Sequence, residues 1–375
     1  MHFNINNIGC ELMNTPADIT ITITDMLAKY QKQINGRLEI FFDEKIEEAL
    51  RISSYTQEVV LNIKEYTLRG GKRLRPIFCI YGYKCLADTD IEAIIDASIS
   101  LELMQSYFLI HDDIMDEDNL RRGELAFHII CKDLCERQFG KNKSPKFGVN
   151  MAIVAGDLLE AYAKEVLIKS EFKPENVNKA LAAYTGITKK VGFGQILDIT
   201  NERRASFNED EILTVHRLKT ASYTTEGPLH IGALLSGAKE ADLQILSNYA
   251  SPLGLAFQIQ DDILGLFGVE GKTGKPTGSD IREGKKSLLI LHALKRCADD
   301  EKELILKALG NERLTADEID VIRAIVRETG SLEYSENLVA GLIDEAVNAI
   351  KDSHFRTDAK EFLADIAYFI GSREY

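Results

Sequence analysis

The chain has 375 residues, 45% of them hydrophobic and 28% charged, with a formal net charge of −14 at pH 7. This size allows one large globular domain or two smaller ones, and the negative charge argues against nucleic acid as the main partner, because phosphate backbones recruit basic surfaces. No stretch approaches the ~18 uninterrupted apolar residues of a membrane helix, and the N-terminus lacks the layout of a signal peptide. Six scattered cysteines without a paired framework are typical of reduced thiols. We therefore expect a cytoplasmic protein without an integral membrane segment.

The first 24 residues are interpreted as an N-terminal extension of unknown role. Residues 1 to about 20 are polar and irregular, and residues 19–24 alternate Ile with Thr, which is a short strand-like pattern. From residue 25 onward, apolar side chains recur at helical spacing, and few prolines interrupt the runs. Nothing marks a boundary between two domains. The sequence predicts a mostly α-helical chain with residues 25–375 as a single domain.

A basic turn interrupts the first helices at residues 70–76, which read Gly-Gly-Lys-Arg-Leu-Arg-Pro. The two glycines free the backbone, and Pro76 does not fit the interior of a regular helix. Lys72 and Arg75 suit a diphosphate anchor, because a guanidinium binds phosphate oxygens bidentately and a lysine adds a point charge. The alternative interpretation is an ordinary basic loop at the surface.

An acidic cluster, Asp112-Asp113-Ile114-Met115-Asp116, ends a largely apolar run. On a helix, Asp112 and Asp116 face the same way, with Asp113 beside them. Three like charges at the end of a core helix predict a bound cation. Mg²⁺ prefers such oxygen ligands and completes its shell with water and substrate phosphates. The alternative is a solvated acidic helix end.

Two arginines, Arg121 and Arg122, follow the acidic cluster, where they would neutralise an empty site or hold phosphate in a filled one. On an ideal wheel of about 100° per residue, Gln105 and Phe108 fall within about 40° of Asp112. Tyr107 points elsewhere on that wheel. The face beneath the carboxylates therefore carries an amide and an aromatic ring.

The middle of the chain contains a predicted loop within residues 131–150, the best candidate for a surface insertion, after which a helical pattern resumes. Cys131 and Cys135 could share a helix face, where ordinary packing is favoured over metal binding. Glycines at 156, 192 and 194 indicate close helix packing. Gln195 and Asp198 follow them and could reach the acidic site.

A second acidic pair, Asp261-Asp262, ends another apolar run at residues 257–265 and repeats the first design. Before it, Lys219 and Thr220 stand side by side, and Lys219 is a second candidate phosphate cation. The glycine-rich residues 271–280 lack the sequence ending and the preceding strand of a P-loop. Residues 288–375 show amphipathic helices for which packing is the expected role.

Two acidic helix ends that face one bundle cavity would bring these groups together, because metal sites are often built in bundle cores. The cations exceed what one diphosphate needs, so we expect two phosphorylated substrates. Lys72, Arg75 and Arg122 would hold one, and the aspartates would hold the other through Mg²⁺, assisted by Arg121, Lys219 and Lys275. Metal-assisted loss of diphosphate gives a carbocation that an alkene attacks, for which a dry apolar cavity is required.

Together these motifs resemble the trans-isoprenyl diphosphate synthases. The resemblance rests on residues 71–76, 112–116, 121–123 and 258–262, in that order along the chain. Residues 274–286 are most similar to archaeal and bacterial geranylgeranyl diphosphate synthases. The resemblance implies an all-α bundle with a large central cavity, usually a homodimer. Such an enzyme condenses isopentenyl diphosphate with an allylic diphosphate (dimethylallyl, geranyl or farnesyl) using about two or three Mg²⁺ ions.

The resemblance also implies roles for individual residues. Contacts to isopentenyl diphosphate fall on Lys72, Arg75, Gln105 and Arg122. Mg²⁺ ligands fall on Asp112, Asp116 and Asp261, and Asp113 and Asp262 count with them as catalytic carboxylates. Contacts to the allylic diphosphate fall on Arg121, Lys219, Thr220, Gln258, Lys275 and Lys285.

Three features depart from the common pattern of the family. Gln105 stands where many members have histidine, and either side chain can donate a hydrogen bond to phosphate. Gly265 replaces the last aspartate of the second acidic motif, as in archaeal-type members, and leaves that side with fewer carboxylates. The loop within residues 131–150 looks about ten residues longer than usual.

The product length is expected to depend on Tyr107 and Phe108, which in this family help to floor the pocket for the growing chain. An aromatic floor implies a short product, farnesyl (C15) or geranylgeranyl (C20), and we favour C20 because of the archaeal-type second motif. A C25 product is a further alternative. Two other classes compete: a class I terpene cyclase has no use for a second diphosphate site, and a non-catalytic partner subunit would have lost aspartates or arginines.

Overall fold

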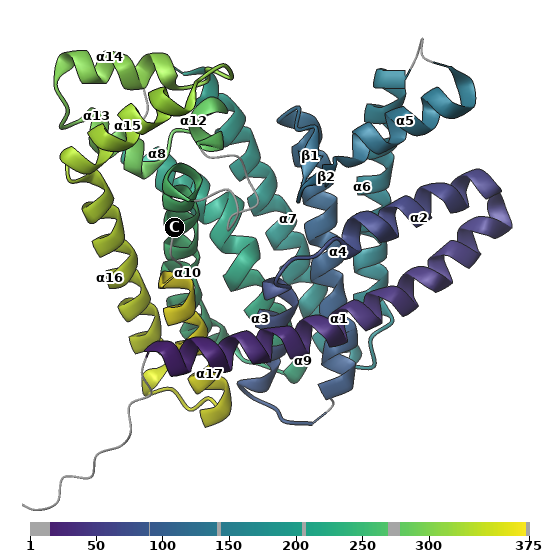
Figure 1. Cartoon of the computed structure of the whole chain (residues 1–375). Helices are drawn as coiled ribbons and strands as arrows, with labels where there is room; N and C mark the ends of the chain where they lie inside the picture. Colours follow the sequence, from purple (N-terminus) through teal and green to yellow (C-terminus); the bar gives the residue numbers. More distant parts are fainter. Residues whose placement is uncertain (1–15, 90, 141–143, 205–207, 269–277, 373–375) are drawn as a thin grey trace, which may run out of the picture.

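The computed structural model describes residues 16–89, 91–140, 144–204, 208–268 and 278–372, and this part of the chain is almost entirely helical (Figure 1). Its helices are α1 (Pro16–Ile52), α2 (Ser54–Leu68), α3 (Leu74–Lys84), α4 (Ile91–Met115), α5 (Phe127–Phe139), α6 (Ser144–Ile168), α7 (Pro174–Arg203), α8 (Glu209–Val215), η2 (His216–Glu226), α9 (Gly227–Ser236), α10 (Glu240–Phe267), α12 (Ser279–Arg282), α13 (Leu288–Leu294), α14 (Asp299–Ala308), α15 (Ala316–Glu328), α16 (Ser331–Lys351) and α17 (Thr357–Gly371). Strands β1 (Leu120–Arg121) and β2 (Glu124–Leu125) form a short antiparallel ribbon after α4. The predicted all-α fold is confirmed.

Several helices begin at residues whose side chains bind the free backbone amides of the first turn. Ser53 accepts a hydrogen bond from the amide of Thr56 (3.1 Å) before α2. Thr315 and Glu318 form a reciprocal capping box before α15. Each such cap stabilises a helix by about 1 kcal/mol.

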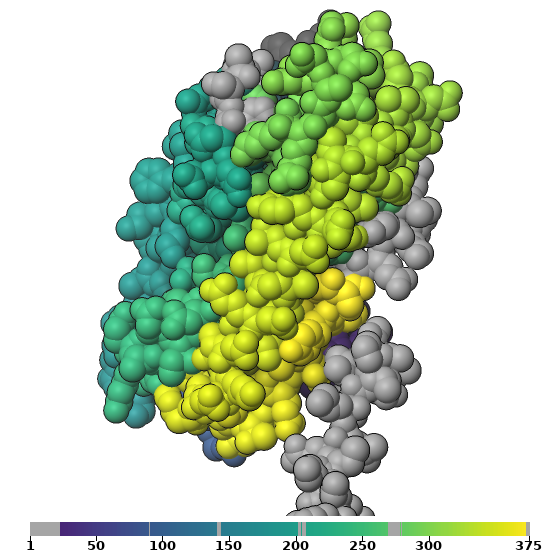
Figure 2. Space-filling view, turned by 90° about the vertical axis from the view of Figure 1, so that its left-hand side faces the viewer, coloured from purple at the N-terminus to yellow at the C-terminus, as the bar shows by residue number. Residues whose placement is uncertain are grey.

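The bundle is built around α4 and α10. Helix α4 packs against α3 and α6, while α10 packs against η2 and α16. The C-terminal ends of α4 and α10 lie toward the same end of the molecule, the upper end in Figure 1, and α1 crosses the opposite end. Helices α16 and α17 cover one face, as the yellow-green and yellow surface of Figure 2 shows. Residues at the ends of α4 and α10 are thereby brought to one side of the fold.

Helix α4 is the core helix of this arrangement. Ile94, Leu101 and Ile110 have no solvent exposure. Within the described residues, it is the one helix long and apolar enough to cross a membrane, but 72% of its apolar window is buried inside the fold. Its apolar character is therefore explained by packing against neighbouring helices on several sides.

Helices α3 and α9 cross closely at two glycines. A Cβ atom on Gly232 would lie 2.8 Å from the carbonyl carbon of Cys79 and closer still to its oxygen. A Cβ atom on Gly82 would lie 2.8 Å from the carbonyl carbon of Leu229. Because the obstacle is backbone on the neighbouring helix, any side chain here would push the helices apart.

We expect Gly232→Ala to destabilise the protein by about 1–3 kcal/mol, as overpacking of a close-packed core does. Gly186→Ala on α7 is the matched control, because a Cβ atom there meets nothing within 4 Å. That replacement should leave stability unchanged or raise it by about 0.4–1 kcal/mol. Urea unfolding followed by circular dichroism measures both, and equal midpoints for the two variants would contradict the crossing described above.

The strand-like expectation for residues 19–24 is wrong, because they lie within α1. Ile23, Leu27, Ile34 and Leu38 are all buried and recur at helical spacing. This apolar stripe against the bundle outweighs the β-preference of a short Ile-Thr alternation. The helix also continues without a break across residues 24 and 25.

The loop expected within residues 131–150 is mostly helix. Helix α5 continues to Phe139 and α6 already begins at Ser144, whose hydroxyl donates to Glu136 (2.7 Å). Gly148 serves close packing of the two helices, because a Cβ atom there would lie 3.0 Å from the amide nitrogen of Lys132. Most of the expected insertion is therefore a packed pair of helices.

The cysteines of α5 behave as packing residues. Cys131 and Cys135 are buried free thiols. Burial raises the pKa of the Cys131 thiol to about 12. The expectation of ordinary packing at these cysteines is confirmed.

Candidate active site

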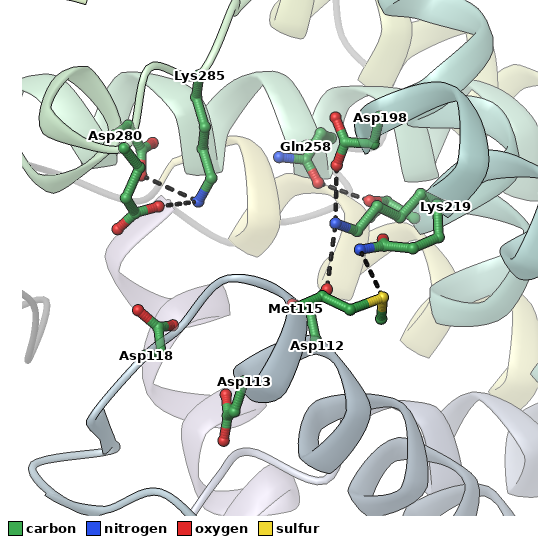
Figure 3. Close-up of polar contacts among 12 residues, drawn as sticks. Asp112, Asp113, Met115, Asp118, Asp198, Lys219, Gln258, Asp280 and Lys285 are labelled. Carbon is green, nitrogen blue, oxygen red and sulfur yellow. Dashed lines mark hydrogen bonds and ion pairs between the residues drawn. The ribbon is translucent and has the colours of Figure 1, made fainter. Parts of the chain in front are cut away.

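The acidic end of α4 meets a lysine from η2. The Nζ of Lys219 lies 3.3 Å from Asp112 and donates to Asp198 of α7 at 2.8 Å, so it bridges two carboxylates (Figure 3). Burial alone would lower the pKa of Lys219, but Asp112, Asp198 and Asp116 outweigh it and the pKa is raised. Lys219 is therefore a fixed cation. The expectation that Asp198 reaches the site is confirmed.

Asp116 lies one turn beyond Asp112 in a crowded electrostatic environment. Burial and the neighbouring Asp112 raise its pKa to about 7, against the opposing influence of Lys219 and Lys285. Because burial and a neighbouring carboxylate disfavour the ionised form of Asp116, added positive charge is favoured beside it. This is the electrostatic character expected of a cation site.

Local backbone structure positions Lys219 and its neighbour Thr220. They lie in η2, a π-helix, a form that is rare and is frequently found at functional sites. A Cβ atom on Gly194 would lie 2.7 Å from the amide nitrogen of Lys219. This glycine allows α7 and η2 to approach, as the sequence suggested, whereas Gly192 has no neighbour within 4 Å. Gln195 also reaches the acidic end of α4, where its amide lies 3.9 Å from the sulfur of Met115.

Asp113 has a different environment from the two aspartates beside it. It is fully buried and accepts hydrogen bonds from the hydroxyl of Tyr66 (2.9 Å) and from Nε of Arg121 (2.6 Å). Arg121 also donates to Asp118 at 2.9 Å. In Figure 3, Asp113 points away from Lys219. In this structure Asp113 and Arg121 therefore tie the β1 ribbon to the end of α4.

The end of α10 carries a chain of polar contacts. Thr220 donates to the amide oxygen of Gln258 (2.7 Å), and the amide nitrogen of Gln258 donates to Asp262 (2.9 Å). The second oxygen of Asp262 is buried without a hydrogen-bond partner among the described residues and lies 3.6 Å from His216. Burial and then Asp280 raise the pKa of Asp262. Three predicted site residues thus form one network between η2 and α10.

His216 is a further member of this network that the sequence motifs do not indicate. Burial lowers the pKa of its imidazole to about 4, so it is neutral at physiological pH. The only signal was its position three residues before Lys219, which on a helix places it near the same face.

The basic turn 70–76 gathers the other predicted cations. Arg122 donates to the carbonyl oxygens of Arg69 (3.1 Å) and Gly70 (2.7 Å). A Cβ atom on Gly71 would lie 3.1–3.3 Å from its guanidinium group, so Arg122 lies directly over the turn. Lys72 lies 5.1 Å above the ring of Phe369 in α17, a contact that the sequence did not indicate.

Two of the groups expected to bind isopentenyl diphosphate contain polar atoms without protein partners. Arg75 donates to Thr224 (2.8 Å) and stacks 4.2 Å from the ring of Tyr223, but its buried Nε has no hydrogen-bond partner among the described residues. The buried side-chain oxygen of Gln105 is also unpartnered there. Such groups are costly unless a ligand or water satisfies them.

A buried ion pair fixes the backbone of the basic turn. Arg73 adopts a left-handed conformation (φ 53°) and its guanidinium group is buried against Glu102 of α4. It also donates to Asn35 (2.8 Å) and to the carbonyl oxygen of Thr67 (3.0 Å). Arg73 therefore ties the turn to three helices, while Gly70, Gly71 and Lys72 lie at the surface. Strained backbone of this kind clusters at functional sites.

The two aromatic residues of α4 lie side by side. The ring centroids of Tyr107 and Phe108 are 4.7 Å apart. Tyr107 also packs against His111 at 5.0 Å, and Phe108 packs edge-on against Tyr223 at 5.4 Å. A Cβ atom on Gly156 would lie 2.5 Å from the His111 ring, so α6 closes against this side. Tyr107 and Phe108 point in different directions on an ideal helical wheel, but their rings are in contact.

The donor set suits Mg²⁺ that is shared with a phosphorylated ligand. Among the described residues, no group of three or more His, Cys, Asp or Glu side chains is arranged to hold a metal ion. Mg²⁺ typically takes one or two protein carboxylates, and water and phosphate oxygens complete its shell. Asp112 and Asp116 offer hard oxygen atoms at one helix end, and Asp261 lies at the other. Lys275, the remaining predicted contact, lies outside the described residues.

The fold and the site define an all-α enzyme in which acidic helix ends lie near lysine and arginine side chains. Comparison with known proteins identifies its family. A family model described as polyprenyl synthetase matches residues 57–327. The chain is 37% identical over 335 residues to a short chain isoprenyl diphosphate synthase of Methanocaldococcus jannaschii, which covers 88% of this chain and 94% of the relative. It is 35% identical to a geranylgeranyl diphosphate synthase of Sulfolobus acidocaldarius over 79% of this chain and 86% of the relative.

Among solved structures, geranylgeranyl pyrophosphate synthase from Corynebacterium glutamicum, complexed with isoprenyl diphosphate and magnesium, superimposes with a TM-score of 0.88. That protein is 31% identical, and the match covers 93% of this chain and 99% of the other. The chain belongs to the polyprenyl synthetase family and is a trans-prenyltransferase. The family resemblance expected from the motifs is confirmed.

Proposed function

We propose that the protein condenses isopentenyl diphosphate head-to-tail with dimethylallyl, geranyl and farnesyl diphosphates and releases geranylgeranyl diphosphate. The observation that carries this proposal is that the protein has two different groups of side chains, each suited to hold one diphosphate. One is acidic with bridging lysines, and the other is a basic turn that the buried Arg73 anchors and that carries Lys72, Arg75 and the adjacent Arg122. A terpene cyclase, which needs a single diphosphate site, has no use for the second.

The acidic side is assigned to the allylic diphosphate. Asp112, Asp116 and Asp261 would hold Mg²⁺, which when bound supplies Lewis-acid stabilisation of the departing diphosphate. Lys219 would donate to the phosphate oxygens in place of Asp112, and Thr220 and Gln258 would complete the hydrogen bonds. Ionisation of the carbon-oxygen bond leaves an allylic cation, and the apolar faces of α4 and η2 would keep water from it.

The basic side is assigned to isopentenyl diphosphate. Arg75 would donate from its unpartnered Nε to a phosphate oxygen, the amide NH2 group of Gln105 would donate to another, and Lys72 and Arg122 add positive charge. The alkene of this substrate would then attack the allylic cation and form the new carbon-carbon bond. Loss of a proton from the resulting cation gives the lengthened allylic product, and the released diphosphate is the natural acceptor of that proton.

The proposed product length rests on the aromatic pair Tyr107 and Phe108, which lies one turn before Asp112. A chain that grows from the diphosphate site along α4 would meet these rings. Since each added isoprene unit needs more room, the rings would stop elongation by exclusion. The archaeal relative named geranylgeranyl diphosphate synthase supports C20 over farnesyl.

Replacing either aromatic residue should lengthen the product. Tyr107→Ala and Phe108→Ala each remove a ring that would block the growing chain, so we expect products of C25 and longer. Chromatographic sizing of dephosphorylated products after incubation with farnesyl diphosphate and labelled isopentenyl diphosphate measures this. Tyr162→Ala, which removes a ring packed against Phe41 instead, is the control. An unchanged product in both α4 variants would exclude these residues from the floor.

The activity itself is tested with purified protein, Mg²⁺, labelled isopentenyl diphosphate and each of the C5, C10 and C15 allylic partners. The expected result is elongation of all three to C20. Release of a cyclic hydrocarbon from an allylic diphosphate alone would favour a terpene cyclase. Absence of any coupled product would favour a non-catalytic partner subunit.

A homodimer and a cytoplasmic location are part of the proposal. Several large apolar side chains on α6 and α7 are exposed, among them Val154 (59%), Phe193 (62%) and Ile196 (61%). Apolar groups of this kind often mark contacts between subunits. A second copy of the chain is the proposed occupant, and sedimentation equilibrium would measure it. Residues 1–24 are proposed as an extension to the synthase domain.

A further inference from the structure

The end of α2 contacts three parts of the site that carry charged groups. Tyr66 reaches the acidic end of α4, where its hydroxyl donates to a carboxylate. The carbonyl oxygen of Thr67 accepts a hydrogen bond from Arg73 of the basic turn (3.0 Å). Arg69 donates to the carbonyl oxygen of Leu125 in the ribbon after α4 (2.7 Å). One helical turn therefore joins the acidic helix end, the basic turn and the ribbon.

The carboxylate that Tyr66 binds is Asp113, which has a different donor on each oxygen. Its Oδ2 accepts from the Tyr66 hydroxyl (2.9 Å), and its Oδ1 accepts from Nε of Arg121 (2.6 Å). Asp113 has no solvent exposure, so water cannot replace either donor. A buried acceptor that loses its donor is costly. Without the hydroxyl, the carboxylate would therefore turn toward Arg121, and the guanidinium group would move with it.

Tyr66 itself is held in place by packing. It is 3% exposed, and its ring lies edge-on against Phe127 of α5, with the ring centroids 5.8 Å apart. Burial and the charge of Asp113 raise the pKa of its hydroxyl well above the ordinary value, so the group remains a proton donor. The position of this phenol therefore determines where Oδ2 of Asp113 lies.

Arg121 is oriented by two carboxylates on one edge of its guanidinium group. Its Nε and Nη2 face Asp113, and Nη2 also donates to Asp118 (2.9 Å). Among the described residues, no partner binds Nη1. The edge toward Asp113 thus fixes the group, and Nη1 is left for a phosphate oxygen.

We propose that Tyr66 is a positioning residue for the allylic diphosphate: its hydroxyl fixes Asp113, and Asp113 fixes the guanidinium group of Arg121 that binds phosphate. Tyr66 acts through these two side chains and touches neither substrate. Because the same helix end holds Arg73, the phenol also keeps Arg121 in a fixed position relative to the basic turn. This inference rests on the proposed function of the site.

Tyr66→Phe tests the proposal, because it removes one oxygen atom and leaves the ring in place. We expect it to weaken the Mg²⁺-dependent binding of inorganic pyrophosphate about tenfold, as the loss of a hydrogen bond to a charged group does. The KM for geranyl diphosphate should rise to a similar extent, and the KM for isopentenyl diphosphate should stay unchanged. In an Arg121→Gln background, Tyr66→Phe should cause no further loss, because the group that it positions is gone.

Tyr249→Phe is the matched control, because Tyr249 is also buried and its hydroxyl donates to the carbonyl oxygen of Leu363 (2.7 Å). It should lose comparable stability in urea unfolding, which also establishes that each variant is folded. Its pyrophosphate affinity and both KM values should equal those of the wild type. Isothermal titration calorimetry with and without Mg²⁺ gives the pyrophosphate affinities.

Wild-type pyrophosphate affinity in Tyr66→Phe would overturn the proposal. An equal loss in Tyr249→Phe would overturn it as well, since the effect would then be one of stability. A further loss of about tenfold on top of Arg121→Gln would show that Tyr66 does not act through Arg121. If the wild-type protein binds pyrophosphate with Mg²⁺ but makes no prenyl product, the proposed function fails, and the pyrophosphate affinities still decide this inference.

Discussion

Asp112→Asn is expected to lower kcat by about 10²–10³-fold, the typical cost of removing one group that stabilises developing charge in an active site. Asp112 contributes an oxygen ligand at the end of α4 and one of the two carboxylates that hold Lys219. Its replacement removes a negative charge from the proposed ion site and leaves Lys219 bound to Asp198 alone. Both effects weaken stabilisation of the departing diphosphate.

Steady-state assays with geranyl diphosphate and labelled isopentenyl diphosphate over a range of Mg²⁺ concentrations measure this loss. Part of it should be recovered at high Mg²⁺, because weaker ion binding is compensated by mass action. Asp43→Asn, which changes an exposed carboxylate paired with Lys64 on the surface, is the control and should be close to wild type. Wild-type activity in Asp112→Asn would remove the α4 end from the reaction.

Glu102→Ala is expected to destabilise the protein by about 3–5 kcal/mol, because it leaves the charge of Arg73 buried without its partner. The two side chains are 4% and 0% exposed, so water cannot compensate for the loss. Arg73 holds the basic turn through its bonds to Asn35 and Thr67. The variant should therefore also raise the KM for isopentenyl diphosphate more than the KM for the allylic substrate.

Urea unfolding measures the free energy of unfolding, and the two KM values are obtained by varying each substrate separately. The double variant Arg73→Met/Glu102→Leu separates stability from function. It should recover most of the stability, because apolar residues can replace a buried ion pair, yet keep the raised KM for isopentenyl diphosphate. Equal changes in both KM values would show that the ion pair has no specific role in positioning the basic turn.

Local sequence was sufficient for the groups that adjacent residues define. Asp112 and Asp116 could be placed on one helix face from their spacing, and Lys219 could be recognised as a cation beside a hydroxyl. The turn at 70–76 could likewise be located from its glycines and charges. In each case, the chemistry depends on side chains that lie within one helical turn of each other along the chain.

Contacts between distant parts of the chain could not be obtained in this way. The partners of Arg73 come from α1, α2 and α4, and the contact between Arg75 and Thr224 joins residues 149 positions apart. Nothing beside Tyr66 in the sequence indicates that its hydroxyl binds Asp113. The strand-like prediction for residues 19–24 was wrong for the same reason. The burial of Ile23 against the bundle is a tertiary effect, which a short stretch of sequence does not reveal.

The π-helix at residues 216–226 constrains the number of residues that this segment can contain. Each of its turns holds about one residue more than an α-helical turn. Deleting one residue would remove part of this excess and change the direction in which the remaining side chains point. Lys219 would then turn away from Asp112, even though every chemical group of the site remained. Apart from the residues of the site, this segment should therefore tolerate an exchange of side chain better than an insertion or a deletion.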